Sequence, residues 1–76
     1  TNSKFYLIVV NIYSNTINKI RHEISKKINK KGFIILSGFN VNQKRSIEAN
    51  FRNLGIIIVK RFIVNNWVTL VLKSTI

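Results

Sequence analysis

The chain opens with a continuous apolar run and contains a second one further along. Phe5–Val10 is apolar and β-branched without alternation, as is typical of a strand covered on both faces. Phe33–Leu36 has the same character. We therefore predict two buried parallel strands, the first ending near Asn11 and the second at Ser37-Gly38.

Each predicted strand is followed by a segment in which apolar residues recur at helical spacing. Gly32 and Gly55 follow these segments and supply the left-handed conformation that commonly ends a helix. We therefore predict two helices. The first has Ser14 or Asn15 as a possible N-cap and the stripe Ile17, Ile20, Ile24 and Ile28; the second has Asn40 or Asn42 and the stripe Ile47, Phe51 and Leu54.

The last third of the chain has the pattern of a hairpin. Ile56–Val64 and Trp67–Lys73 are strand-like, and Asn65-Asn66 between them tolerates positive φ. The order β-α-β-α-β-β predicts an α/β fold with a C-terminal antiparallel hairpin. Right-handed crossovers then put both helices on one face of the sheet. The other face is left uncovered although the first strands are apolar throughout, so we expect part of its cover to lie outside this chain.

The amino-acid composition excludes several kinds of catalytic and metal-binding site. The 76 residues include no Cys, which excludes disulfides, thiolate catalysis and Cys-based zinc sites. The one histidine, His22, excludes a His-cluster metal site unless other groups supply ligands. The apolar run Phe5–Val10 is far short of the roughly 20 residues that span a bilayer, so we expect no membrane partner. Because the chain begins at Thr1 and lacks Met, we expect a single piece of a longer domain.

The net charge of +11 comes from 13 Lys and Arg against 2 Asp and Glu. Ile, Asn and Lys supply 14, 11 and 9 residues, a bias that codons rich in A and T also produce. The charge favours nonspecific attraction to nucleic acid whatever its origin. It does not by itself identify a specific nucleic-acid partner.

Several short motifs follow one another along the chain in the order of a known family. They are Val10-Asn11-Ile12, Lys31-Gly32, Ser37-Gly38, Gln43 and Trp67-Val68. On these motifs the chain resembles the C-terminal half of the class I S-adenosylmethionine-dependent methyltransferases, most closely the PrmA family, which methylates the large-subunit ribosomal protein numbered eleven. The resemblance implies that the four strands take places 4-5-7-6 of a seven-stranded Rossmann-like sheet.

The chain also departs from the family pattern. Val10 stands where the family usually has Ala, and Tyr13 stands where Leu is common, and both can crowd a pocket. The family's glycine-rich loop and the acidic residue on its next strand have no counterpart, and the chain contains no GxG sequence. Most of the S-adenosylmethionine site is therefore expected outside this chain.

Asn11 is the candidate catalytic residue. Ligands of open α/β sheets bind at the carboxyl ends of strands, where Asn11 follows six apolar residues. An amide oxygen can orient the N–H groups of an acceptor amine without adding a titrating group. The resemblance implies that Asn11 also lines the methyl-donor end of the cofactor. The alternative is a cap or turn residue in an Asn-rich chain.

Ser37 and Gly38 are candidate substrate-binding residues. They follow the second strand, on the same edge of the sheet as Asn11, and Gly38 allows a close approach of a substrate backbone. They would shape the pocket for an acceptor lysine. The alternative is a plain strand-to-helix turn, because Ser and Gly are common turn residues.

The remaining chemistry-bearing residues have structural interpretations. The aromatic residues can stack bases beside Lys60, Arg61 and Arg52, although core packing also explains them. His22 is expected on a solvated helix face, and Glu23 and Glu48 are each expected in a surface salt bridge. The aromatic residues in question are Tyr6, Tyr13, Phe62 and Trp67, and core packing is expected for Phe5, Phe33, Phe51, Phe62 and Trp67.

The favoured hypothesis, which follows from the resemblance, is the C-terminal half of a PrmA-like protein-lysine methyltransferase. It implies a cytoplasmic enzyme that uses S-adenosylmethionine and acts on a ribosomal protein, and we expect this piece to be inactive alone. Its exposed sheet face and open strand edge predict docking to an upstream half of the same domain, or self-association. A small basic RNA-binding module without catalysis is the alternative from another class. A decayed, noncatalytic remnant is the third.

Overall fold

The computed structural model describes residues 5–11 and 17–75. The predicted element order is confirmed, since strands and helices follow one another as β-α-β-α-β-β. The elements are β1 (Phe5–Asn11), α1 (Ile17–Lys27), β2 (Ile28–Asn40), α2 (Val41–Arg52), β3 (Ile56–Val64) and β4 (Trp67–Ser74).

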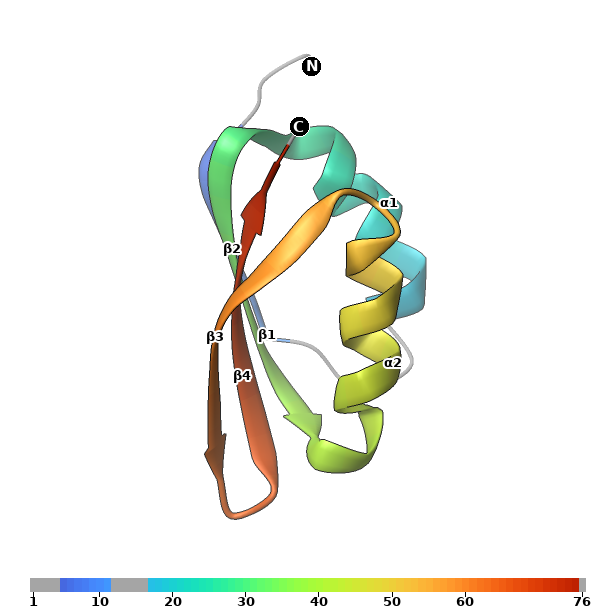
Figure 1. The fold of residues 1–76 in the computed structure, drawn as a ribbon, viewed down its shortest axis with the longest axis vertical. Helices are drawn as coiled ribbons and strands as arrows, with labels where there is room; N and C mark the ends of the chain where they lie inside the picture. Colours follow the sequence, from blue (N-terminus) through green and yellow to red (C-terminus); the bar gives the residue numbers. More distant parts are fainter. Residues whose placement is uncertain (1–4, 12–16, 76) are drawn as a thin grey trace.

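The four strands form one sheet in the order β1-β2-β4-β3. β1 and β2 are parallel, and β4 runs antiparallel to both of its neighbours, β2 and β3. The predicted hairpin therefore folds so that its second strand inserts between β2 and β3. This is the strand order that the resemblance implied, and Figure 1 shows the twisted sheet that results.

Both helices lie on the same side of the sheet, as the crossover rule predicts (Figure 1). α2 packs onto β2, β3 and β4, and its Phe51 is completely buried; α1 packs against α2 and contributes Ile20 and Ile24 to the same core. The buried core consists of Ile24, Ile28, Ile34, Leu36, Phe39, Ile47, Phe51, Ile56, Val68, Leu70 and Leu72. None of the helices in the described part of the chain is long and apolar enough to cross a membrane.

The predicted end of the first helix is wrong. α1 ends at Lys27, and Ile28 already belongs to β2, where it pairs with Phe5 of β1. Gly32 lies inside that strand and is not in the left-handed region; Lys31 is, at φ 65°. Gly32 is needed for space, because a Cβ there would lie 2.9 Å from the backbone oxygen of Asn29 and 2.8 Å from Ile28 Cδ1.

The second helix begins as predicted from one of the two proposed caps. Asn40 is the N-cap, and its Oδ1 accepts a hydrogen bond from the backbone N–H of Asn42 at 3.0 Å. Gln43 Oε1 accepts from the backbone N–H of Asn40 at 3.2 Å, which completes a capping box. α2 ends at Arg52, and Gly55 turns the chain into β3 with φ 79°. The caps proposed for the first helix, Ser14 and Asn15, lie outside the described residues.

The turn of the hairpin has the predicted chemistry. Asn65 and Asn66 both have positive φ, 51° and 69°, as a two-residue type I′ turn requires. The backbone N–H of Val41, at the start of α2, donates to the carbonyl of Asn66 at 3.0 Å. The turn is thereby attached to the end of the sheet at which β2 finishes.

The face of the sheet opposite the helices is uncovered and largely apolar. The prediction that Phe5, Phe33, Phe62 and Trp67 belong to the core is wrong, and Trp67 is 60% exposed. In each strand, alternate residues point away from the helices, and among the described residues no layer covers them. The open face, as we call it, carries Leu7, Val9, Phe33, Ile35, Ile57, Phe62, Val64, Trp67 and Val71, with Lys60 and Lys73.

Candidate functional site

Asn11 and Ser37 lie side by side on the two parallel strands, Asn11 at the carboxyl end of β1 and Ser37 inside β2. Asn11 is the last residue of β1 and is exposed, and its register partner on β2 is Ser37, which is half-buried. Val10, immediately before Asn11, packs against the core on the helix side. Because side chains alternate along a strand, Asn11 projects on the open face, and Val10 does not crowd it. Tyr13, the other residue expected to crowd a pocket, lies outside the described residues.

The row that begins with Asn11 and Ser37 continues across the sheet. Ser37 pairs with Thr69 of β4, and Thr69 pairs with Phe62 of β3. An amide, two hydroxyls and an aromatic ring therefore follow one another on the open face. We call these four residues the rim row. None of them carries a charge, so the rim row can bind uncharged hydrogen-bonding groups or an amine without electrostatic repulsion.

Gly38 lies at a β-bulge rather than after the end of its strand. β2 continues to Asn40, and on it the pair partners step from Ser37 to Phe39 while those on β4 step by one residue, from Thr69 to Val68. Gly38 is the additional residue, and its φ of 92° is in the region that favours glycine. The bulge directs Phe39 into the core, where it is completely buried. The interpretation of Ser37-Gly38 as a strand end is therefore wrong.

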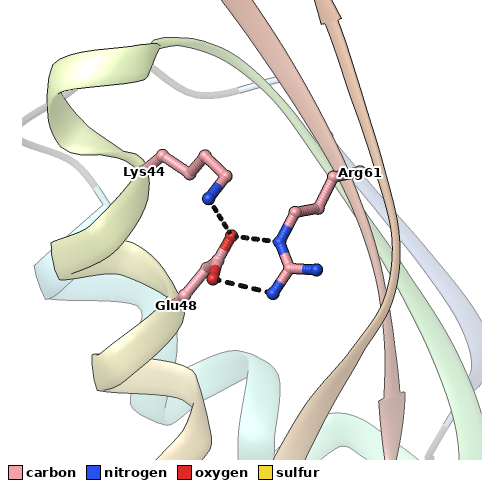
Figure 2. Close-up of polar contacts among 3 residues, drawn as sticks. All are labelled: Lys44, Glu48 and Arg61. Atoms are coloured by element: carbon pink, nitrogen blue, oxygen red, sulfur yellow. Dashed lines mark hydrogen bonds and ion pairs between the residues drawn. The ribbon is translucent and has the colours of Figure 1, made fainter.

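A second polar group joins the helix layer to the sheet. Arg61 of β3 donates to Glu48 of α2 through two contacts, Nε to Oε2 at 2.8 Å and Nη2 to Oε1 at 3.1 Å. Lys44 Nζ lies 3.1 Å from Glu48 Oε2 (Figure 2). The side chain of Glu48 is only 7% exposed, whereas that of Arg61 is 45% exposed. The expected pairing with a basic residue at helical spacing is confirmed, but the expected surface position of Glu48 is wrong.

These contacts determine the charge state of Glu48. The hydrogen bond from Arg61 lowers the pKa of Glu48 most; burial opposes that effect, and the hydrogen bond from Lys44 adds to it. The net result is a pKa below the ordinary value of 4.5. Glu48 is therefore a carboxylate at neutral pH with both oxygens occupied, so it serves to hold β3 against α2 rather than to transfer protons.

Sequence reasoning missed the partnership between Glu48 and Arg61. The contact between Glu48 and Lys44 can be predicted from the sequence, because Lys44 lies four residues before Glu48 on the same helix. Arg61 is thirteen residues away on another element. The available signal was the adjacent pair Lys60-Arg61 within an otherwise apolar strand, because a cation on the covered face of a sheet requires a partner there.

The other titratable residues form no second cluster of this kind in the ranges 5–11 and 17–75. Glu23 approaches Lys27 at 4.0 Å with both side chains well exposed, a weak surface pair of the type expected. His22 is exposed on α1, where it was predicted. Those ranges contain no group of three His, Cys, Asp or Glu residues that could hold a metal ion.

Comparison with known sequences gives a consistent result over almost the whole chain. A family model described as ribosomal protein L11 methyltransferase (PrmA) matches residues 1–75. The chain is 29% identical over 71 residues to the ribosomal protein L11 methyltransferase of Campylobacter concisus, and 27% identical over 71 residues to that of Rhodopseudomonas palustris. Each match covers 93% of this chain but 25% and 24% of the relatives, so the chain spans about a quarter of their length.

Solved structures show the same fold. The crystal structure of ribosomal protein L11 methylase from Lactobacillus delbrueckii subsp. bulgaricus matches with a TM-score of 0.89 and 24% identity, over 97% of this chain and 39% of that one. A methyltransferase from Pyrococcus furiosus matches with a TM-score of 0.75 and 15% identity, over 99% of this chain and 43% of that one. The arrangement of strands and helices thus occurs within larger methyltransferase chains.

Proposed function

This chain belongs to the PrmA family, and from that membership we propose that it forms the C-terminal part of an enzyme that transfers a methyl group from S-adenosylmethionine to a lysine of a ribosomal protein. Two relatives are named ribosomal protein L11 methyltransferases, which supports that class of acceptor. The observation that carries the proposal is the position of Asn11 at the carboxyl end of β1, the side of the sheet on which α/β folds bind their ligands, with Ser37 beside it on β2.

The residues of the rim row suit S-adenosylmethionine and an amine. When bound, S-adenosylmethionine supplies a methyl group on a positively charged sulfur. Asn11 and Ser37 offer an amide and a hydroxyl, and neither adds a positive charge that would repel that sulfur. Most of the groups that hold the cofactor belong, on this proposal, to a part of the protein outside this sequence, since the chain has no GxG loop.

The proposed work of Asn11 is to orient the acceptor. An amine reacts through its lone pair, so its N–H groups must point away from the incoming carbon. The exposed amide oxygen of Asn11 accepts one such N–H and fixes the direction of the lone pair. Ser37 binds beside it, and Gly38, which has no side chain, leaves room for the acceptor's backbone.

The proposed remainder of the protein also accounts for the open face. A sheet face that carries exposed Leu7, Val9 and Ile57 is normally covered, because large exposed apolar patches mark interaction surfaces. β1 is an edge strand that pairs with β2 on one side only. An upstream portion of the domain would cover the part of the face that carries Leu7, Val9 and Ile57, leave the rim row open, and extend the sheet at β1. Alone, the chain would be inactive and would self-associate.

Reconstitution tests this proposal. The chain would be combined with the part of the Campylobacter concisus relative that it does not cover, and methyl transfer to purified ribosomal protein L11 measured with labelled S-adenosylmethionine. We expect transfer by the assembled protein and none by the chain alone. An assembled complex that binds S-adenosylmethionine but methylates no ribosomal protein would contradict the acceptor, and it would favour a noncatalytic remnant.

One observation favours a second function, the binding of single-stranded nucleic acid by the open face. Phe33 and Phe62 are exposed, and Lys73 Nζ and Lys60 Nζ lie 5.6 and 5.8 Å from the centres of their rings. Aromatic rings beside lysines are the usual means of binding unpaired bases. Binding of RNA that weakens steeply with salt and is lost in Phe62→Ala would support this function; RNA binding insensitive to Phe62→Ala would leave only nonspecific charge attraction.

A further inference from the structure

The end of the β3–β4 hairpin exposes apolar side chains on both of its faces. We call Phe62–Trp67 the hairpin tip. Val64 pairs with Trp67 on the open face, and the two are 68% and 60% exposed. Ile63 pairs with the buried Val68 and therefore lies on the helix side, yet it is 52% exposed. A layer that covered only the open face would leave Ile63 in solvent. Figure 1 shows why, since the hairpin extends past the first turn of α2.

The hairpin tip lies beside the candidate site. Phe62 belongs to the rim row that begins with Asn11, and Trp67 pairs with Asn40 at the end of β2. Neighbouring strands are about 4.8 Å apart, so Phe62, three strands from Asn11, lies ~14 Å from it. A protein interface of standard size covers about 800 Å² on each partner, so a single interface extends over more than this distance. A protein that presented an amine at Asn11 would reach the hairpin tip.

The hairpin tip is fixed before any partner arrives. Arg61, the residue before Phe62, is held by Glu48. At the other end, the carbonyl of Asn66 accepts from the backbone N–H of Val41. A rigid surface with large aromatic side chains loses little conformational entropy on binding, which favours its use as a contact.

We propose that the hairpin tip is a docking surface for the acceptor protein, which contacts it with an apolar patch next to the lysine that enters at Asn11. This inference rests on the proposed function, since the acceptor is that of the methyl transfer. The six residues of the hairpin tip carry no charge, in a chain with a net charge of +11. A partner that offers a lysine meets no repulsion there, whereas a nucleic acid would have to find its phosphate contacts outside the hairpin tip, at residues such as Lys60.

Fluorescence tests the inference directly, because Trp67 is the sole tryptophan of the chain. Purified ribosomal protein L11 would be titrated into the reconstituted enzyme, with Phe in place of any tryptophan in L11 and in the added part, while acrylamide quenching is measured. We expect the emission of Trp67 to shift to shorter wavelength and its quenching to fall. Val64→Ser should weaken the effect, whereas Ile57→Ser, an equally apolar change at the far end of β3, should not. Unchanged quenching, equal weakening by both variants, or protection by RNA alone would overturn the inference.

Kinetics of the reconstituted enzyme separate this inference from the proposed function. Trp67→Ala should raise KM for ribosomal protein L11 roughly tenfold with little change in kcat, as expected for loss of a binding hot spot. Trp67→Phe should restore most of the KM. Methyl transfer with an unchanged KM in Trp67→Ala would overturn docking and leave the proposed function intact. Absence of transfer, with Trp67 still protected by the acceptor, would contradict the proposed function and support docking.

Discussion

Glu48 of α2 and Arg61 of β3 hold each other through both carboxylate oxygens, at 2.8 and 3.1 Å. The contact joins the helix layer to β3, an edge strand of the sheet. Arg61 is the residue immediately before Phe62 of the rim row. Since Glu48 is nearly buried, its charge depends on Arg61 and Lys44 rather than on water. The position of the hairpin is thus linked to a single carboxylate on α2.

Replacing Glu48 tests the strength of that link. Glu48→Gln should lower the free energy of unfolding by about 1–3 kcal/mol, because the amide cannot accept two charged donors in the same buried place. Urea denaturation of the chain measures the change. Glu23→Gln is the matched control, since Glu23 and Lys27 are both well exposed, and it should change stability by less than ~0.5 kcal/mol. Equal losses in the two variants would show that the buried contact has no special role.

Stability should also depend on Glu48 through pH. Its pKa in the folded protein lies below the ordinary value of 4.5, so the unfolded chain takes up a proton first as the pH falls. The stabilisation is therefore fully present above pH 4.5 and is lost as the pH falls through the pKa of the folded state. Thermal melts at decreasing pH measure this loss. Glu48→Gln should lose less stability over the same interval, and parallel curves would contradict the assignment.

Gly38 should be intolerant of side chains for a conformational reason. Its φ of 92° is strained for any residue with a Cβ, so Gly38→Ala should cost about 1–2 kcal/mol. Gly38→Asn should cost less, because Asn adopts positive φ more readily. Urea denaturation compares the two variants. An Ala variant as stable as the parent would indicate that the bulge rearranges at no cost.

Two substitutions at one turn position should act in opposite directions. Asn66 has φ 69° in the type I′ turn, where Gly is the preferred residue, so Asn66→Gly should leave stability unchanged or raise it. Asn66→Val should lower the free energy of unfolding by roughly 1–2 kcal/mol, because a β-branched side chain is strained at positive φ. Thermal denaturation of both variants is the measurement. The same sign for both would contradict the turn assignment.

Asn11 should matter for catalysis and not for folding. In the reconstituted enzyme, Asn11→Ala should lower kcat about 100-fold, the effect expected from a misoriented acceptor. Because Asn11 is exposed at a strand end, the same change should alter stability by less than ~0.5 kcal/mol. Asn42→Ala, which removes an exposed Asn in the first turn of α2, is the matched control and should leave kcat unchanged. Equal rates in the two variants would remove Asn11 from the proposed site.

The sequence predicted the elements best where local chemistry is specific. The Asn65-Asn66 turn and the left-handed Gly55 follow from backbone preferences that neighbours do not alter. Gly32 was misinterpreted because its local signal resembles a helix stop. Ile28 instead pairs with Phe5 of β1 in the sheet, because pairing between strands outweighs local propensity. The proposal of Asn40 as a cap succeeded because the capping groups are close in sequence.

The sequence by itself determined the order of strands and helices, the hairpin, and the end of the first strand at Asn11. Periodicity, turn chemistry and strand ends are local properties, so they can be read without the tertiary structure. Only the tertiary structure decided that Phe33 and Trp67 face an uncovered surface, since hydrophobicity does not reveal which face of a strand has a neighbour. It also decided that Arg61 meets Glu48 and that the rim row connects Asn11 to the hairpin. Both depend on register between strands distant in sequence, which is established by the packing of the whole sheet.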